Sequence, residues 1–181
     1  MTCIVGYVDR ENSKVYMGAD SAAICDCSKT IRKDVKLFRN GDFIIGCTKS
    51  YRMIQLLQYS FKPPEIKKEI HEYMCTDFVN AIRECFKDGG FMEKTQQDSE
   101  SGGLFLVGYK DRLFKIEDDF QVGERVDRFD AIGSGGDFAL GALYVLPNLK
   151  GRSIEENLIT ALEVAEYLSF GVESPFTILH T

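Results

Sequence analysis

Long apolar runs are missing from this 181-residue sequence. A helix that spans a membrane needs about 20 consecutive apolar residues, and no stretch of the chain approaches that length. Lys14 and Asp20 interrupt the first apolar stretch, and no basic segment precedes it. We therefore expect no transmembrane helix and no signal peptide, and we expect a cytoplasmic protein.

Histidine is scarce, since His71 and His180 are the only two in the chain. Six cysteines accompany them, but only Cys25 and Cys27 are close together in the sequence. A tetrahedral metal site needs four ligands at suitable spacings. The sequence therefore predicts no metal centre, and in a cytoplasmic protein it predicts reduced thiols.

An excess of positive charge is also missing. The chain has 22 basic and 28 acidic residues, which gives a net charge of −6. This balance disfavours nucleic acid or an anionic membrane as the main partner. Hydrophobic residues make up 44%, as in ordinary globular proteins, and we find no internal repeat or low-complexity segment. We expect a single domain that spans residues 1–181.

The first quarter of the chain has the pattern of paired β-strands. Residues 3–9 and 14–19 are apolar runs joined by a polar turn, which predicts a hairpin. Residues 35–39 and 42–47 predict a second hairpin around Asn40-Gly41, a strong turn signal. Apolar residues fill both alternating faces of these strands, so we expect both faces of the sheet to be covered.

The remaining elements fall into blocks instead of alternating between strand and helix. This grouping predicts an α+β fold, a four-layer αββα sandwich of two mostly antiparallel sheets with a helix pair outside each. The expected helices are residues 49–60, 65–87, 136–146 and 154–168; the expected strands are residues 103–109, 112–116, 129–132 and 175–180; residues 92–101 are an expected polar loop.

Thr2 stands between the start methionine and the first predicted strand. If Met1 is removed, the Thr2 amine, with an ordinary pKa of about 7.7–8.0, can take the proton of the hydroxyl on the same residue. Such a nucleophile also needs a cation, an acid to hold that cation, and a backbone N–H for the oxyanion. Asp20, Lys36 and Gly46, at or near the predicted strands, are candidates for these three parts.

Several short segments then point to a known family. They are residues 2–5, 18–21, 36–38, 45–46 and, most specifically, the Ala-Ile-Gly-Ser-Gly-Gly stretch at 131–136. Through most of its length the chain resembles the proteasome-type threonine peptidases of the N-terminal-nucleophile hydrolases, and it is nearer the bacterial HslV type than a eukaryotic subunit.

The resemblance implies a site made of Thr2, Asp20 and Lys36. Asp20 and Lys36 are 36 − 20 = 16 positions apart, which is the separation that the family uses, and Lys33 fails this spacing. Gly46 matches the glycine that binds the oxyanion.

Two serines extend the implied site. Ser134 matches a serine near the threonine amine that helps to relay protons. Ser169 stands where the family often has an aspartate in an Asp-x-x-Ser pattern, and Val172 replaces the second serine of that pattern. A second departure follows Gly46, where the family prefers small residues and glycine but this chain has residues 47–50 as Cys-Thr-Lys-Ser.

The resemblance further implies a threonine-type endopeptidase that needs no metal or organic cofactor. It implies a self-compartmentalised, homo-oligomeric ring that degrades unfolded polypeptides, with an ATP-dependent unfoldase as a companion. Ile44 is a candidate for lining the pocket that receives the substrate residue before the cleaved bond.

Other interpretations remain open. The chain could be a catalytically silent structural subunit of such a ring, which the Ser169 and Val172 departures favour, or an amidase for small substrates. The glycines of residues 133–136 could cradle a phosphate, although the lysine of a P-loop is missing. Cys3 could be a thiol nucleophile, but strand alternation points it away from the face of Thr2.

Overall fold

The computed structural model describes residues 1–25, 28–91, 93–94 and 100–181. Strands β1–β6 span Ile4–Asp9, Lys14–Ala19, Ala22–Cys25, Ser28–Ile31, Leu37–Asn40 and Phe43–Cys47. Strands β7–β13 span Glu93–Lys94, Glu100–Ser101, Phe105–Tyr109, Arg112–Ile116, Val122–Gly123, Phe129–Ile132 and Thr177–His180. Helices α1–α5 span Tyr51–Tyr59, Ile70–Tyr73, Val79–Asp88, Gly136–Val145 and Ile154–Leu168, with a π-helical turn at Met74–Phe78 and a 3₁₀ turn at Leu146–Asn148.

Two larger sheets form the centre of the molecule, and every strand pair in them is antiparallel. One sheet has the order β12-β1-β2-β13, and the other has the order β11-β10-β9-β6-β5. The first predicted hairpin is present as β1 and β2, in register from Ile4 opposite Ala19 to Asp9 opposite Lys14. The second is present as β5 and β6, and its turn contains Gly41 with φ +58°.

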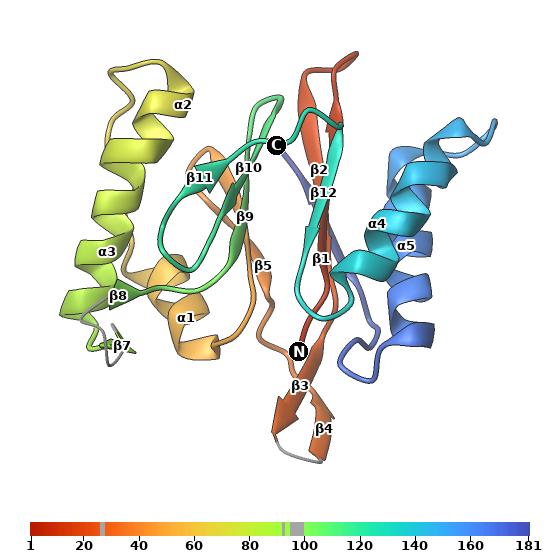
Figure 1. The fold of residues 1–181 in the computed structure, drawn as a ribbon, viewed down its shortest axis with the longest axis horizontal. Coiled ribbons are helices and arrows are strands. Elements are labelled where there is room, and N and C mark those ends of the chain that lie inside the picture. The colour runs from red at the N-terminus through yellow and green to blue at the C-terminus, as the bar shows by residue number, and fades with distance from the viewer. Residues whose placement is uncertain (26–27, 92, 95–99) are drawn as a thin grey trace.

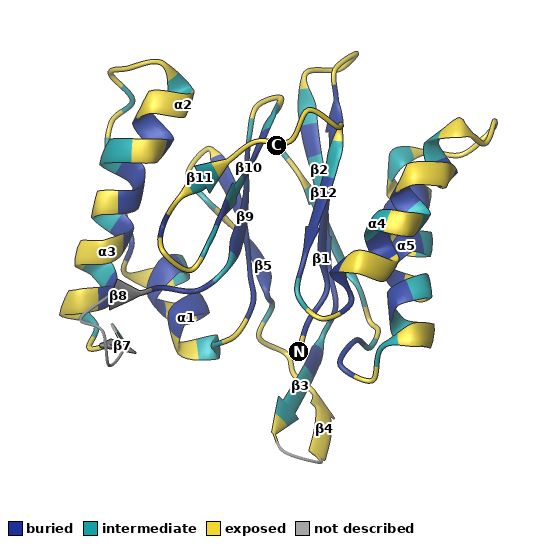
Figure 2. Cartoon of the chain, viewed as in Figure 1, coloured by how far each residue is buried: buried dark blue, intermediate teal, exposed yellow. Residues whose placement is uncertain are grey.

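Helices lie outside both sheets (Figure 1). Helices α1 and α3 flank the sheet that contains β5, β9 and β10, whereas α4 and α5 flank the sheet that contains β1, β2 and β12. Figure 2 shows that the strands of both sheets are mostly buried and that the helices expose their outer faces. The mixed α/β architecture with antiparallel sheets is therefore confirmed.

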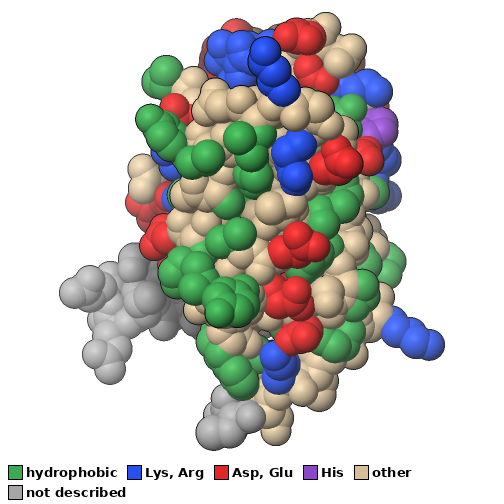
Figure 3. All heavy atoms as spheres, turned by 90° about the vertical axis from the view of Figure 1, so that its right-hand side faces the viewer, with side chains coloured by type: hydrophobic (Ala, Val, Ile, Leu, Met, Phe, Trp, Pro, Cys, Tyr) green, Lys and Arg blue, Asp and Glu red, His purple; other side chains and the backbone are tan. Residues whose placement is uncertain are grey.

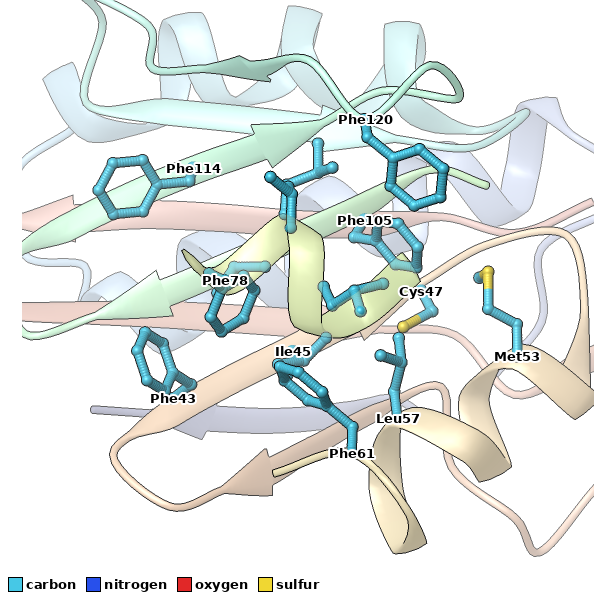
Figure 4. Packing of buried hydrophobic residues seen from close by; sticks show 14 of the residues in the cluster. Phe43, Ile45, Cys47, Met53, Leu57, Phe61, Phe78, Phe105, Phe114 and Phe120 are labelled. Atoms are coloured by element: carbon cyan, nitrogen blue, oxygen red, sulfur yellow. The ribbon is translucent and has the colours of Figure 1, made fainter. Parts of the chain in front are cut away.

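Among the described residues, three hydrophobic clusters fill the space between these elements. Ile4 and Met17 of the first sheet pack between the sheets with residues such as Leu106. A second cluster joins α4 and α5 to β1 and β12. The third and largest cluster lies under α1 and α3. In it Phe78 packs against Phe43, with 4.9 Å between the two ring centroids (Figure 4). Burial on both faces of the strands explains their continuous apolar runs.

Helix ends follow local sequence signals. Ser153 accepts a hydrogen bond from the N–H of Glu156 and the Glu156 carboxylate accepts one from Ser153, so α5 begins at a complete capping box. Ser50 caps α1 by accepting a hydrogen bond from the Arg52 N–H. Within the described part of the chain, none of the helices has the length and apolar character that crossing a membrane requires.

The structure departs from the predicted elements in a few places. The β3–β4 hairpin was not predicted, because its strands are short and all of β4 is exposed and lacks an apolar alternation. The helix expected from residue 65 begins at Ile70, several residues after the break at Pro63-Pro64. Residues 92 and 95–99 of the expected polar loop lie outside the described residues.

Candidate active site

Thr2 precedes β1 and is enclosed by the turn at residues 133–135. Its N–H donates to the Ser134 hydroxyl at 3.3 Å, and its carbonyl accepts a hydrogen bond from the Gly135 N–H at 3.1 Å. Only 4% of Thr2 is exposed. At Gly133, where φ is +94°, a Cβ atom would come within 2.2 Å of the Thr2 carbonyl oxygen. The glycines considered above as a phosphate cradle therefore serve to hold the backbone of Thr2.

Asp20 and Lys36 form a buried ion pair. The Lys36 ammonium donates to both carboxylate oxygens of Asp20, at 2.8 and 2.9 Å, and the two side chains are 3% and 0% exposed. The Asp20 oxygens also accept the N–H groups of Cys3, at 2.9 Å, and Ala22, at 3.0 Å. Asp20 is thus joined to the strand that Thr2 begins and to the start of β3.

Burial and the Asp20 carboxylate have opposite effects on the pKa of Lys36. Desolvation lowers the pKa of Lys36 below its usual 10.5, and the charge and hydrogen bonds of Asp20 oppose this effect. The ammonium faces inward toward Asp20, and the Lys36 carbonyl accepts a hydrogen bond from the Cys47 N–H of β6 at 3.0 Å.

Thr2 and Lys36 line the same cavity of about 60 Å³. One wall comes from β3, and the opposite wall comes from the end of β6 and the first turns of α1. The other lining residues are Met1, Ala22, Ile24, Cys47, Thr48, Lys49, Ser50, Tyr51 and Ile54. The structure therefore brings Thr2 and the Lys36–Asp20 pair to one concave site, which is the arrangement that nucleophilic catalysis needs.

Gly46 does not fit the role that the sequence predicts for it. It lies inside β6 between Leu37 of β5 and Leu106 of β9, so its backbone groups belong to the sheet. It does not line the cavity, and a Cβ at Gly46 would come within 2.5 Å of Ile4. This glycine permits close packing between the two sheets. Ile44, the candidate pocket residue, likewise lies in the core between the sheets.

Lys49 offers the N–H that Gly46 cannot supply. The N–H groups of Cys47, Thr48 and Ser50 donate to backbone carbonyls. Lys49 has a left-handed φ of +73°, and within the described residues its N–H has no acceptor. Lys49 lines the cavity and comes immediately before Ser50, the N-cap of α1, where the helix dipole favours negative charge.

Ser169 is half-buried at the end of α5, and it is not joined directly to Thr2. Its carbonyl accepts the Val172 N–H at 3.2 Å, and among the described residues no hydrogen bond links the Ser169 side chain to Thr2. Gly171 in the same turn lies against Met1, since a Cβ there would be 2.2 Å from the Met1 Cβ. The Met1 carbonyl accepts the Thr2 hydroxyl at 2.5 Å.

Cys3 packs away from the cavity in the cluster under α4 and α5. Burial and the charge of Asp20 raise the pKa of its thiol to about 12, with Lys36 acting in the opposite direction. Because the thiolate is the reactive form, Cys3 is a poor nucleophile at neutral pH. Cys27 lies outside the described residues, so the Cys25–Cys27 pair is not described.

Sequence reasoning missed Lys49, Tyr51 and Gly171 as parts of the site. Lysine carries no signal for a left-handed backbone, although the unusual Cys-Thr-Lys-Ser stretch after Gly46 marked the place. Tyr51 was assigned to a helix, and nothing in the sequence showed that the start of this helix borders the cavity.

Searches of family models and of curated proteins found no match for this chain. Among solved structures, it is similar to BPH from Thiobacillus denitrificans in complex with epoxomicin, with a TM-score of 0.83, 20% identity, and coverage of 99% of this chain and 98% of that chain. It is also similar to HslV from Trypanosoma brucei, with a TM-score of 0.69, 20% identity, and coverage of 99% and 98%. A Gly-1 mutant of Anbu from Hyphomicrobium sp. strain MC1 matches with a TM-score of 0.66, 16% identity, and coverage of 98% and 80%. Over nearly its whole length, the chain therefore has the fold of proteasome-type proteins.

Proposed function

We propose that this chain is a threonine-type peptidase whose nucleophile is Thr2, exposed by removal of Met1. The observation that carries the proposal is the shared cavity of Thr2 and Lys36, with Lys36 held by buried Asp20. The hydrogen bond between the Thr2 nitrogen and Ser134 supports it further, because it would orient the free amine. The fold shared with proteasome-type proteins is consistent with this chemistry.

The mechanism uses the amine of Thr2 as its own base. The amine, held by Ser134, takes the hydroxyl proton as the oxygen attacks the carbonyl carbon of a substrate peptide bond. The Lys36 ammonium favours the deprotonated oxygen and neutral amine by its charge. When the C–N bond breaks, the leaving amine receives the proton, and the acyl group stays on Thr2 as an ester. Water then attacks the ester, releases the acid and restores the hydroxyl.

The oxyanion of the tetrahedral intermediate would be bound by the Lys49 N–H. Its free N–H, left-handed backbone and position before α1 favour this role over Gly46. Preorganised backbone donors of this kind typically contribute about 10²–10³ in rate. Replacing Lys49 by glycine keeps the N–H and relaxes the backbone, so we expect Lys49→Gly to retain activity. A loss of about tenfold or more would instead assign the function of Lys49 to its side chain.

We also propose that the chain, as one domain with the αββα layering of N-terminal-nucleophile hydrolases, assembles into a ring of identical subunits in the cytoplasm. Exposed large apolar side chains of the described residues concentrate on α4, α5 and the turns that follow them, the face turned toward the viewer in Figure 3. They include Phe138, Tyr144, Val145 and Tyr167. Such a patch is typical of protein contacts, and native mass spectrometry would measure the ring.

A closed ring would restrict the substrates to unfolded polypeptides, and an ATP-dependent unfoldase would then supply them. If native mass spectrometry finds a stable monomer that cleaves small amides, the small-substrate amidase becomes the better description. A degradation assay would test the companion. It would compare a folded protein with an unfolded substrate such as casein, each with and without a candidate ATPase.

One observation favours a catalytically silent subunit as a second candidate. In the described residues, the Ser169 side chain makes no hydrogen bond to Thr2, where the family often has a supporting aspartate. Intact mass spectrometry of the purified protein separates the two functions. Loss of Met1 supports the peptidase, and retention of Met1 in every preparation supports the silent subunit.

An epoxyketone such as epoxomicin tests the chemistry directly. It should add its mass to the wild type, because it reacts with a terminal amine and hydroxyl on the same residue. Thr2→Ala should abolish labelling. Thr48→Ala is the matched control, since Thr48 lines the same cavity without being terminal, and labelling should survive. Labelling that persists in Thr2→Ala would exclude the proposed nucleophile.

A further inference from the structure

The hydroxyl of Tyr51 is a buried polar group that has no partner among the residues the structure describes. Among the described residues, its oxygen is the buried side-chain atom for which the structure provides no hydrogen bond. Tyr51 is the first residue of α1 and lines the cavity that Thr2 and Lys36 share. A buried hydroxyl left unsatisfied is unfavourable, and such groups in native proteins call for an explanation, for example a catalytic role or a bound water or ion.

The ring that carries this hydroxyl is held in place. The Arg32 guanidinium carbon lies 4.1 Å from the Tyr51 ring centroid, within the range of a cation–π contact. Asp34 pairs with Arg32 in turn: its carboxylate accepts a hydrogen bond from Arg32 Nε at 2.9 Å, and its other oxygen lies 2.6 Å from a second guanidinium nitrogen in an ion pair. The hydroxyl is therefore positioned before any substrate arrives, which reduces the entropy lost on binding.

The surroundings of the hydroxyl favour a short and uncharged group. Ala22 and Ile24 of β3 and Ile54 of α1 supply apolar lining to the same small cavity. The charged groups nearby are already paired, Lys36 with Asp20 and Arg32 with Asp34. No lining cation is left over to balance an acidic side chain in this part of the described structure, apart from Lys49, whose ammonium binds Asp118.

Tyr51 itself is neutral at physiological pH. Burial raises the pKa of Tyr51 to about 12, with Arg32 opposing the shift and the carboxylates of Asp34 and Asp20 adding to it. The group can therefore both donate and accept a hydrogen bond. The same two carboxylates would repel an acidic side chain that approached the hydroxyl.

Resting on the proposed peptidase function, we propose that Tyr51 is a specificity-determining residue. Its hydroxyl selects substrates whose residue before the cleaved bond has a short neutral side chain with a hydroxyl or carboxamide, such as threonine, serine or asparagine. An apolar side chain of the same shape would leave the Tyr51 hydroxyl unpaired, so it would be cleaved less efficiently. This preference contrasts with the apolar pocket that Ile44 suggested from the sequence.

The test compares two fluorogenic peptides that differ only in threonine or valine before the cleaved bond. In the wild type we expect kcat/KM to be roughly tenfold higher for threonine, as one neutral hydrogen bond provides. Tyr51→Phe keeps the ring over Arg32 and removes the hydroxyl, so the ratio should fall to about one, with cleavage of the valine peptide retained. Tyr59→Phe is the control, because Tyr59 is exposed at the other end of α1, and it should leave the ratio unchanged.

Two further readouts keep the inference falsifiable. Tyr51→Phe removes an unpaired polar atom, so its thermal unfolding temperature should equal or exceed that of the wild type; a clear decrease would mean that the hydroxyl already has a partner. Equal cleavage of both peptides by a wild type that epoxomicin labels would overturn the role of Tyr51 alone. A Met1-free wild type that is neither labelled nor active on either peptide would overturn the peptidase proposal and this inference together.

Discussion

Asp20 and Asp130 are buried acids of the same sheet, but the fold surrounds them differently. Asp20, which follows β2, is 2% exposed, and Asp130 in β12 is 5% exposed. The two oxygens of Asp20 receive the Lys36 ammonium at 2.8 and 2.9 Å and two backbone N–H groups. The negative charge of Asp20 is thus matched by a buried cation and by donors of the backbone.

Asp130 has a weaker set of partners. One of its oxygens accepts the Ala131 N–H at 2.8 Å, and the nearest Arg125 nitrogen is 3.6 Å away. Burial raises the pKa of Asp130 above its usual value, while Ala131, Arg125 and Lys115 act in the opposite direction. Burial alone therefore does not mark a functional carboxylate. The donors that surround it distinguish Asp20, which is paired with a buried cation, from Asp130, whose pKa is raised.

The largest difference should appear when the cation of each acid is removed. Lys36→Met leaves Asp20 buried without its counter-ion, which typically costs about 3–5 kcal/mol in the free energy of unfolding. It should also lower kcat/KM by about 10²–10³ or more, because the charge beside Thr2 is lost. Arg125→Met should cost less than about 1 kcal/mol, because Arg125 is half-exposed and its nitrogen lies 3.6 Å from the Asp130 carboxylate.

Urea unfolding and peptide cleavage, measured on Met1-free protein, check this pair of variants. If Lys36→Met and Arg125→Met lose similar amounts of stability, the distinction between the two acids is wrong. If Lys36→Met keeps full activity, Lys36 has only a structural role.

Replacing the acids themselves should also cost more stability at Asp20 than at Asp130, but the difference should be smaller. Asp20→Asn keeps the shape but leaves Lys36 without a counter-ion, so we expect kcat/KM to fall by about tenfold to a hundredfold and stability to fall by about 2 kcal/mol. Asp130→Asn should be neutral or slightly stabilising at pH 7, because an amide avoids the burial of a charge. Equal loss of stability in both variants, measured by urea unfolding, would contradict the comparison.

The pH profile of activity reports on Lys36. In the proposed mechanism its ammonium is the active form, and burial lowers the pKa of Lys36 below the usual 10.5. As pH rises through this lowered pKa, the charge is lost, so kcat/KM should decline on the alkaline side before pH 10.5 is reached. The neutral amine of Thr2 should set the acid side, below its ordinary pKa of about 8, because the nearby charge of Lys36 favours the neutral form. An alkaline side that is flat up to 10.5 would show that the charge of Lys36 is not required.

The sequence predicted best what local signals determine. Helix α5 begins and ends where its capping box and apolar period indicated. Residues 16 positions apart in the sequence, Asp20 and Lys36, proved to be a buried pair. By contrast, β4 of the β3–β4 hairpin is exposed, so its sequence lacks the apolar alternation that packing against a core requires.

The parts of the site that the sequence could not give depend on tertiary context. Which backbone N–H remains free is decided by strand pairing, and this pairing engages Gly46 and leaves Lys49. Lys49 has a left-handed backbone, and a lysine in the sequence does not predict this conformation. The hydroxyl of Tyr51, unpaired among the described residues, is part of the site because the fold brings the start of α1 to the same cavity as Thr2.

The smallest expected effect is the pH dependence that Asp130 contributes to stability. Its pKa in the folded state lies above the usual 3.8, so the folded protein binds more protons than the unfolded chain between these two values. Stability contributed by Asp130 is therefore complete below the unfolded pKa and is lost as pH rises through the folded one. We expect the wild type to lose stability relative to Asp130→Asn as the pH rises, measured by urea unfolding between about pH 4 and pH 8. Asp111 is an exposed acid that lines the same surface pocket as Asp130, so Asp111→Asn should leave the wild-type dependence unchanged. If the wild type instead gained stability relative to Asp130→Asn over this range, the contrast between the two acids would disappear.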